Sequence, residues 1–124
     1  MKEIISSDAP AAIGPYSHAV VHNDLIFCSG QIPLNPDTMA IDAATIEDQT
    51  RQVMENLLHV LKACGADLKS ILKTTIFLDS MEDFTAMNTV YEEILDGHKP
   101  ARSTVEVSRL PRGVKIEIEC IASA

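Results

Sequence analysis

The last quarter of the chain constrains the fold most, because it contains two runs in which apolar and polar residues alternate with period two. The runs span residues 100–107 and 114–121. Between them, Leu110-Pro111-Arg112-Gly113 has the composition of a turn. The pattern therefore predicts two strands joined as an antiparallel hairpin centred near Leu110.

One face of this predicted hairpin is polar and is a candidate site. Side chains alternate between the two faces of a strand, so Arg102 is expected on the same face as Glu117 and Glu119. An arginine held beside carboxylates could bind a small anion and activate a water molecule. The alternative is an ordinary solvated face, because antiparallel sheets commonly expose one face to water.

The rest of the chain predicts further strands and two helices. One helix begins near Thr45, where Thr45-Ile46-Glu47-Asp48 resembles a capping box with Asp in place of Glu, and Gly65 suits the position after its end. A second helix follows the cap-like Ser80-Met81-Glu82-Asp83, and both carry an apolar stripe at helical spacing. The expected strands are residues 3–6, 19–21, 25–29 and 71–78, and residues 32–44 are expected to form a loop.

The predicted order is thus β-β-β-α-β-α-β-β in a single α+β domain, residues 1–124, with two helices on one face of the sheet. Leu25-Ile26-Phe27-Cys28 has no polar face, and residues 71–78 are polar on only part of one face. Two helices can cover one face of such a sheet, so we expect another copy of the chain to cover the second face. The candidate polar site would then lie at or beside a subunit interface.

Composition narrows the class of partner. The 124 residues are 46% hydrophobic and carry a net charge of −8, which disfavours nucleic acid and anionic membranes as partners. No apolar run is long enough to span a membrane, and the first residues do not resemble a targeting segment, so we expect a cytoplasmic protein. Cys28, Cys64 and Cys120 are interpreted as small buried residues rather than as a metal site or a disulfide framework.

Three further positions have both an ordinary and a functional interpretation. Tyr16 follows a Pro- and Gly-rich extended segment and would ordinarily be a half-buried aromatic residue. Ser29-Gly30-Gln31 ends a strand, where Gly30 allows either a bulge or close approach by a ligand or another chain. Asn88 lies beside the stripe of the second helix and would ordinarily point to solvent.

Taken together, the chain resembles the YjgF/RidA family of reactive-intermediate deaminases over almost its whole length. Its most specific feature is a Pro-Ala-Arg-Ser opening at Pro100 followed by Ile116-Glu117-Ile118. The other matching segments are Ala12-Ile13-Gly14-Pro15-Tyr16-Ser17, Ser29-Gly30-Gln31-Ile32-Pro33, Leu72-Lys73-Thr74-Thr75-Ile76-Phe77 and Met87-Asn88-Thr89-Val90-Tyr91.

The resemblance implies a chorismate-mutase-like fold assembled as a homotrimer, with pockets in the clefts between subunits. It implies hydrolysis of 2-imino acids or their enamine tautomers, such as 2-iminobutanoate and 2-iminopropanoate, to 2-oxo acids and ammonia without cofactor or metal. By position, Arg102 matches the carboxylate-binding arginine and Glu117 the water-holding glutamate. Other pocket positions are matched by Tyr16, Ser29, Gly30, Asn88 and Thr104.

The chain also departs from the family pattern, since Thr104 stands where many deaminating members carry Cys. Threonine can replace cysteine there if the position acts through its backbone carbonyl. The alternative function is a trimeric protein that binds or senses 2-oxo acids, or regulates a partner, without turnover. A ribonuclease role, also attributed to family members, is disfavoured by the acidic charge.

Overall fold

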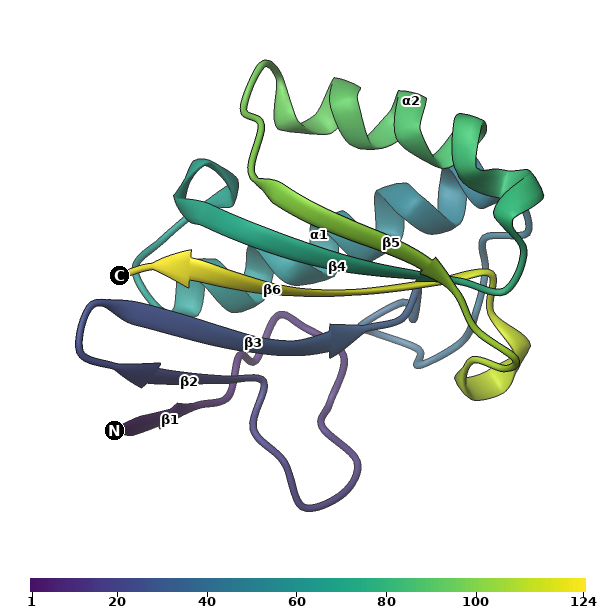
Figure 1. Ribbon diagram of the computed structural model, residues 1–124. Coiled ribbons are helices and arrows are strands. Elements are labelled where there is room, and N and C mark those ends of the chain that lie inside the picture. Colours follow the sequence, from purple (N-terminus) through teal and green to yellow (C-terminus); the bar gives the residue numbers. More distant parts are fainter.

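A six-stranded mixed sheet in the order β1-β2-β3-β6-β4-β5 forms the centre of the computed structural model, which describes residues 1–124 (Figure 1). The strands are β1 (Lys2–Ile4), β2 (Ala19–His22), β3 (Leu25–Gln31), β4 (Ile71–Leu78), β5 (Ala101–Glu106) and β6 (Ile116–Ser123). The helices are α1 (Ile46–Ala63) and α2 (Phe84–Leu95). This order confirms the predicted succession of elements and the α+β class. Neither helix is long and apolar enough to cross a membrane.

The helix ends follow the predicted capping chemistry. The side chain of Thr45 accepts a hydrogen bond from the backbone N–H of Asp48 at 3.1 Å, which satisfies a free donor of the first turn of α1. Gly65 follows the end of α1 with a φ of +77°, a conformation that favours glycine. Ser80 caps a short 3₁₀ turn, Met81–Asp83, that leads into α2.

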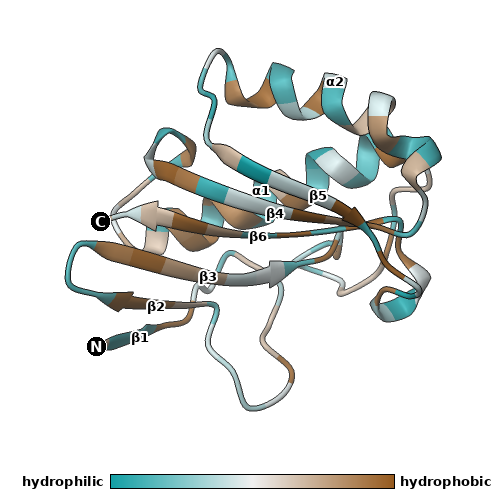
Figure 2. Ribbon diagram, viewed as in Figure 1, coloured by the Kyte–Doolittle hydropathy of each residue, from teal (hydrophilic) through white to brown (hydrophobic).

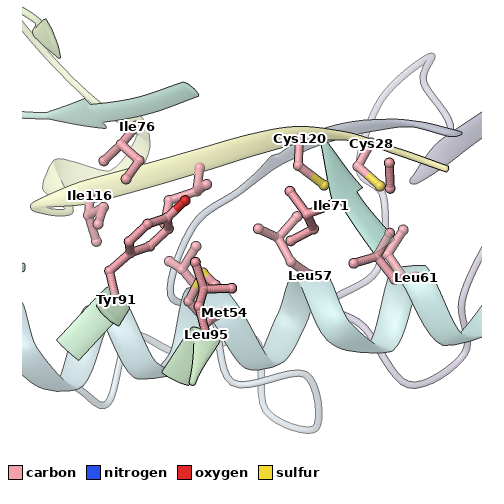
Figure 3. Close-up of a cluster of buried hydrophobic side chains, with 14 of the residues drawn as sticks. Cys28, Met54, Leu57, Leu61, Ile71, Ile76, Tyr91, Leu95, Ile116 and Cys120 are labelled. Carbon is pink, nitrogen blue, oxygen red and sulfur yellow. The ribbon is translucent and has the colours of Figure 1, made fainter. Parts of the chain in front are cut away.

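The hydrophobic core lies between the helices and one face of the sheet (Figure 3). The α1 residues Leu57 and Leu61 are completely buried there, close to Cys28 and Cys120. The two cysteines lie directly opposite each other on β3 and β6, and both are free thiols. A hydrogen bond from the Cys28 thiol to Cys120, together with burial, raises the pKa of the Cys28 thiol. Cys28 and Cys120 are buried small residues, as predicted, whereas Cys64 is only partly buried.

The other face of the sheet, which we call the open face, has no helix over it. Phe27 is 43% exposed and Val105 is 43% exposed, and Figure 2 shows the hydrophobic colouring of the first half of β3. The prediction that β3 is apolar on both faces is therefore confirmed. Alternation along residues 71–78 predicts that Leu72 faces the same side as Ile76 and Leu78, and this prediction is wrong. A bulge after Ile71 shifts the register and leaves Leu72 48% exposed.

The predicted hairpin of residues 100–107 and 114–121 is wrong. β5 pairs with β4 in parallel, and β6 pairs antiparallel with the other edge of β4, so β4 lies between them. The reason is that α2 connects β4 to β5 as a crossover, which brings the second strand back parallel to the first. The segment after β5 then passes round the end of β4, where the Val107 N–H donates to the carbonyl of Leu78 at 2.8 Å.

This topology also corrects the predicted shared face of the charged residues. Arg102 is the partner of Thr74, which is fully buried on the helix side of β4. Glu117 is the partner of Phe77, which points to the open face. Paired residues point to the same side of a sheet, so Arg102 and Glu117 lie on opposite faces.

Candidate active site

The residues predicted to form the site fall into two groups on different parts of the chain. Arg102, Asn88 and Thr104 belong to the α2 side of β4 and β5. A separate cavity at the end of β3 is lined by Tyr16, Gly30 and Glu117. Ser29 directly precedes Gly30 in the sequence. Within one chain the structure therefore assembles each group but does not bring the two groups together.

Arg102 and Asn88 of the first group line a cavity of about 480 Å³, here called the arginine cavity, together with Tyr91 and Lys99, whereas Thr104 does not line it. Arg102 projects from the edge strand β5, and its Nη1 donates to Oδ1 of Asn88 at 2.6 Å. This contact replaces the ordinary interpretation of Asn88 as a solvent-facing residue. The remaining N–H donors of the guanidinium are free to bind a carboxylate.

Two aromatic rings of α2 also contact Arg102, and sequence reasoning assigned them only to the apolar stripe of the helix. The guanidinium carbon of Arg102 lies 5.5 Å from the ring centre of Phe84 and 5.4 Å from that of Tyr91. Phe84, Asn88 and Tyr91 are spaced four and three residues apart, so they share one face of α2. Two aromatic residues on the same helix face as an asparagine are the sequence signal that could have identified Phe84 and Tyr91 as contacts of Arg102.

The second group lines a cavity of about 430 Å³, here called the glutamate cavity. Glu117 is half-buried, and Tyr16, Gly30 and Arg112 line the same space with several apolar side chains. Gly30 touches the carboxylate closely: a Cβ at this position would lie 3.0 Å from Cδ and 3.2 Å from Cγ of Glu117. Gly30 lies where the pairing of β3 with β6 shifts register between Cys28 and Gln31, which agrees with the ordinary interpretation of a bulge or irregularity. The group that approaches it closely is the side chain of Glu117 in the same chain, whereas approach by a ligand or another chain stays a prediction.

The environment of Glu117 favours its protonated form. Burial raises the pKa of this carboxyl group, and the nearby negative charge of Glu119 raises it further. A carboxyl group whose pKa lies above its ordinary value can both accept and return a proton nearer to neutral pH. Glu119 is exposed on the same face of β6, two residues away.

Ser29 holds the loop that carries Tyr16. Its hydroxyl donates to the carbonyl of Ser17 at 2.7 Å, and its backbone N–H donates to the carbonyl of His18 at 2.9 Å. His18, which sequence reasoning did not single out, is fully buried; its Nδ1 accepts from the N–H of Ser6 at 2.9 Å, and its Nε2–H donates to the carbonyl of Pro10 at 2.7 Å. These bonds fix both ends of the loop around Tyr16.

The hydroxyl of Thr104 is buried and has no hydrogen-bond partner in the chain. Thr104 is the partner of Ile76 and shares the helix side of the sheet with Arg102. A buried hydroxyl group without a partner costs free energy. No hydrogen bond from its hydroxyl group holds the side chain of Thr104 in place. No group of three or more His, Cys, Asp or Glu side chains is arranged to hold a metal ion.

Comparison with known proteins identifies the family. The family model described as endoribonuclease L-PSP matches residues 6–124, almost the whole chain. The chain belongs to this family, the YjgF/RidA/RutC family. The predicted family is therefore confirmed.

The YjgF/RidA/RutC relatives carry several names. Reactive Intermediate Deaminase A of Arabidopsis thaliana is 48% identical over 98% of this chain and 66% of its own length. The crystal structure of the E. coli YjgF gene product has a TM-score of 0.95 and 44% identity, covering 99% of this chain and 98% of that one. E. coli TdcF with bound serine also has a TM-score of 0.95, with 42% identity over 100% of this chain and 99% of that one.

Proposed function

We propose that this member of the YjgF/RidA/RutC family hydrolyses 2-imino acids, or their enamine tautomers, to 2-oxo acids and ammonia. The observation that carries the proposal is the half-buried carboxyl group of Glu117, whose pKa is raised and whose position requires that residue 30 have no side chain. The name of the Arabidopsis relative points to the same chemistry for that protein. The E. coli relative TdcF has serine bound, and serine carries a carboxylate next to a carbon–nitrogen bond, as a 2-imino acid does.

The complete site is proposed to form between two copies of the chain. Arg102 and Glu117 lie on opposite faces and line different cavities, so one chain cannot place both against a small molecule. The exposed apolar side chains of the open face favour its burial by another copy. In a homotrimer, the arginine cavity of one subunit would meet the glutamate cavity of the next, giving three equivalent sites.

Arg102 is proposed to hold the substrate. The guanidinium binds the carboxylate through two parallel N–H···O bonds, which fix the position and the plane of the neighbouring C=N group. Asn88 occupies one donor and leaves the others for the ligand. The substrate carbon is thereby held still while water approaches from the glutamate cavity.

Glu117 is proposed to move the protons. It accepts a proton as water adds to the carbon of the protonated imine, and a C–O bond forms while the C=N double bond becomes single. Glu117 then returns that proton to nitrogen and the C–N bond breaks. Ammonia leaves while the added hydroxyl group loses its remaining proton to water and becomes the carbonyl group of the 2-oxo acid. General acid–base help of this kind contributes on the order of 100- to 10,000-fold, and the raised pKa of Glu117 suits both steps.

A coupled assay tests the proposal. A threonine dehydratase generates 2-iminobutanoate in the presence of semicarbazide, which traps the imine as a semicarbazone. We expect a substoichiometric amount of the protein to reduce semicarbazone formation, because hydrolysis by a catalyst competes with the trap. An effect that requires stoichiometric protein would contradict catalysis and favour the alternative, a trimer that binds 2-oxo acids without turnover.

Two matched variants locate the catalytic group. Glu117→Gln keeps the size of the side chain but removes the base, so we expect a loss of about 100-fold or more in turnover. Glu119→Gln makes the same chemical change two residues away on the same face and should affect the rate much less. Calorimetric binding of 2-oxobutanoate should persist in both, since Arg102 supplies it; full activity of Glu117→Gln would refute the assignment.

The family model's description raises a second activity, RNA cleavage. A net charge of −8 works against binding a polyanion, because association with RNA depends on neutralising its phosphates. The arginine cavity contains only two side chains with a permanent positive charge, Arg102 and Lys99. This is enough for one carboxylate but does not provide a surface for an RNA strand.

A further inference from the structure

The aromatic residues around Arg102 are not accounted for by carboxylate binding alone. Phe84 and Tyr91 do not need to touch the substrate, yet both rings lie against the guanidinium, at 5.5 and 5.4 Å from its central carbon. We propose that Phe84 and Tyr91 are positioning residues, which fix the plane of the Arg102 guanidinium before the carboxylate arrives. This inference rests on the proposed function, in which Arg102 binds the substrate.

The need for positioning follows from where Arg102 lies. It projects from β5, the edge strand of the sheet, and its side chain is exposed. A free arginine there would sample many rotamers, and binding a carboxylate would have to order it. An aromatic face attracts the guanidinium, stacks parallel to it and leaves its edge N–H donors open.

The rings themselves are held from the core. Tyr91 is 6% exposed, and its hydroxyl shares a hydrogen bond of 2.8 Å with Oγ1 of Thr74. Thr74 is fully buried on β4 and is the strand partner of Arg102. The chain of contacts therefore runs from Thr74 on β4 through the ring of Tyr91 on α2 to the guanidinium of Arg102 on β5.

Asn88 completes the arrangement from the same helix face. Its Oδ1 accepts from Nη1 of Arg102 at 2.6 Å, which holds one edge of the guanidinium while the two rings lie near its central carbon. The Phe84 ring is only partly buried, so it can be exchanged without opening the core. It is therefore the residue through which the positioning role can be tested.

The first test measures binding and kinetics. Phe84→Leu removes the aromatic face but keeps an apolar side chain, and we expect the Kd for 2-oxobutanoate to rise about 2- to 5-fold, the scale of an exposed cation–π contact. KM for the imine should rise by the same factor with kcat unchanged, because the carboxylate contact is present in both the ground state and the transition state. Phe84→Tyr restores the aromatic face and should restore both values.

The second test observes Arg102 directly in the ligand-free protein. The chain has four arginines, and only Arg102 lies over aromatic rings, so its Nε–Hε proton should be shifted upfield by ring currents in a ¹H–¹⁵N spectrum. Phe84→Leu should move this signal towards the other three. Ile94→Ala is the matched control, since it removes an apolar side chain of α2 that packs on the core and should change neither the signal nor the Kd.

The outcomes separate the inference from the proposed function. If the wild-type protein binds 2-oxobutanoate and Phe84→Leu binds it equally well, the positioning role is overturned while the proposed function stands. A rise in Kd that Phe84→Tyr does not reverse, or that Ile94→Ala reproduces, also overturns it. If the wild-type protein neither binds 2-oxobutanoate nor hydrolyses the imine, the proposed function and this inference fail together.

Discussion

Gly30→Ala tests whether the placement of Glu117 matters for catalysis. The backbone of Gly30 does not have the positive φ that only glycine adopts easily, so alanine meets no conformational penalty there. Its Cβ would, however, lie 3.0 Å from Cδ and 3.2 Å from Cγ of Glu117, whereas ordinary contacts of this kind begin at 3.4 Å. The added Cβ would also overlap Oε2 of Glu117, so the carboxylate must turn to another rotamer or move well away from its present position.

The size of the effect follows from that displacement. Moving a catalytic group by about 1 Å can cost on the order of 100-fold in rate, so we expect a loss of about 10- to 100-fold in imine hydrolysis. The displaced side chain is flexible, and forcing a χ angle away from its minimum costs only about 0.5–1.5 kcal/mol, so the stability should change by no more than that. The assay is the semicarbazide competition, with urea denaturation run in parallel.

A second glycine, Gly65, serves as a control, because its replacement should lower the stability and leave the activity unchanged. Gly65 has a φ of +77°, and a Cβ added there would have no atom within 4 Å, so Gly65→Ala introduces backbone strain without a clash. We expect it to lose about 1–2 kcal/mol of stability with full activity. If Gly30→Ala retains full activity, the close approach of Gly30 to Glu117 has no catalytic meaning, and the assigned role of Glu117 is refuted with it.

Four further changes have defined outcomes. Arg102→Lys keeps the charge but loses the fork of N–H donors, so calorimetry should show loss of 2-oxobutanoate binding with an unchanged fold; retained binding would make Arg102 a surface residue. Phe27→Asp places a charge on the open face, and sedimentation equilibrium should then give the 13.5 kDa chain mass in place of three times that mass; a monomeric wild type would remove the basis for a shared site. Glu119→Gln removes a charge that raises the pKa of Glu117, so the acid limb of kcat/KM should move to lower pH, and a stationary limb would mean that another group sets it. Urea denaturation should show Glu117→Gln to be more stable than the wild type at neutral pH and equally stable in acid. The reason is that a carboxyl group with a raised folded-state pKa contributes stability that is lost as the pH rises through that pKa. Lower stability of the variant at neutral pH would contradict a cost of burying this charge.

Much of the fold could be predicted because it depends on local signals. The cap at Thr45 and the glycine after α1 mark ends that the structure places within a residue or two of the predicted ones. The absence of a polar face in β3 likewise predicted an apolar open face. These features depend on neighbours in the sequence, and period and turn chemistry describe such neighbours well.

Strand pairing could not be predicted in the same way. Alternation shows which residues of one strand share a face, but it does not show which strand lies alongside, and β4 separates β5 from β6. The relative faces of Arg102 and Glu117 were therefore predicted wrongly, although both residues were identified. Phe84 and Tyr91 were missed as contacts of Arg102 for a related reason, since the apolar stripe of a helix does not reveal which of its edges meets a charged residue from another strand.

The separation of Arg102 from Glu117 has a chemical consequence that the predicted hairpin would not have had. As neighbours on one face they would form an ion pair, which lowers the pKa of the carboxyl group and occupies the donors of the guanidinium. With β4 between them, burial and Glu119 instead raise the pKa of Glu117, and Arg102 contacts only Asn88 and two aromatic rings. Each group thus keeps the property that the proposed reaction needs, a proton-accepting carboxylate and an unpaired guanidinium. In a composite site the substrate itself would lie between them, so its carboxylate would bind Arg102 while Glu117 remained free to take a proton from water.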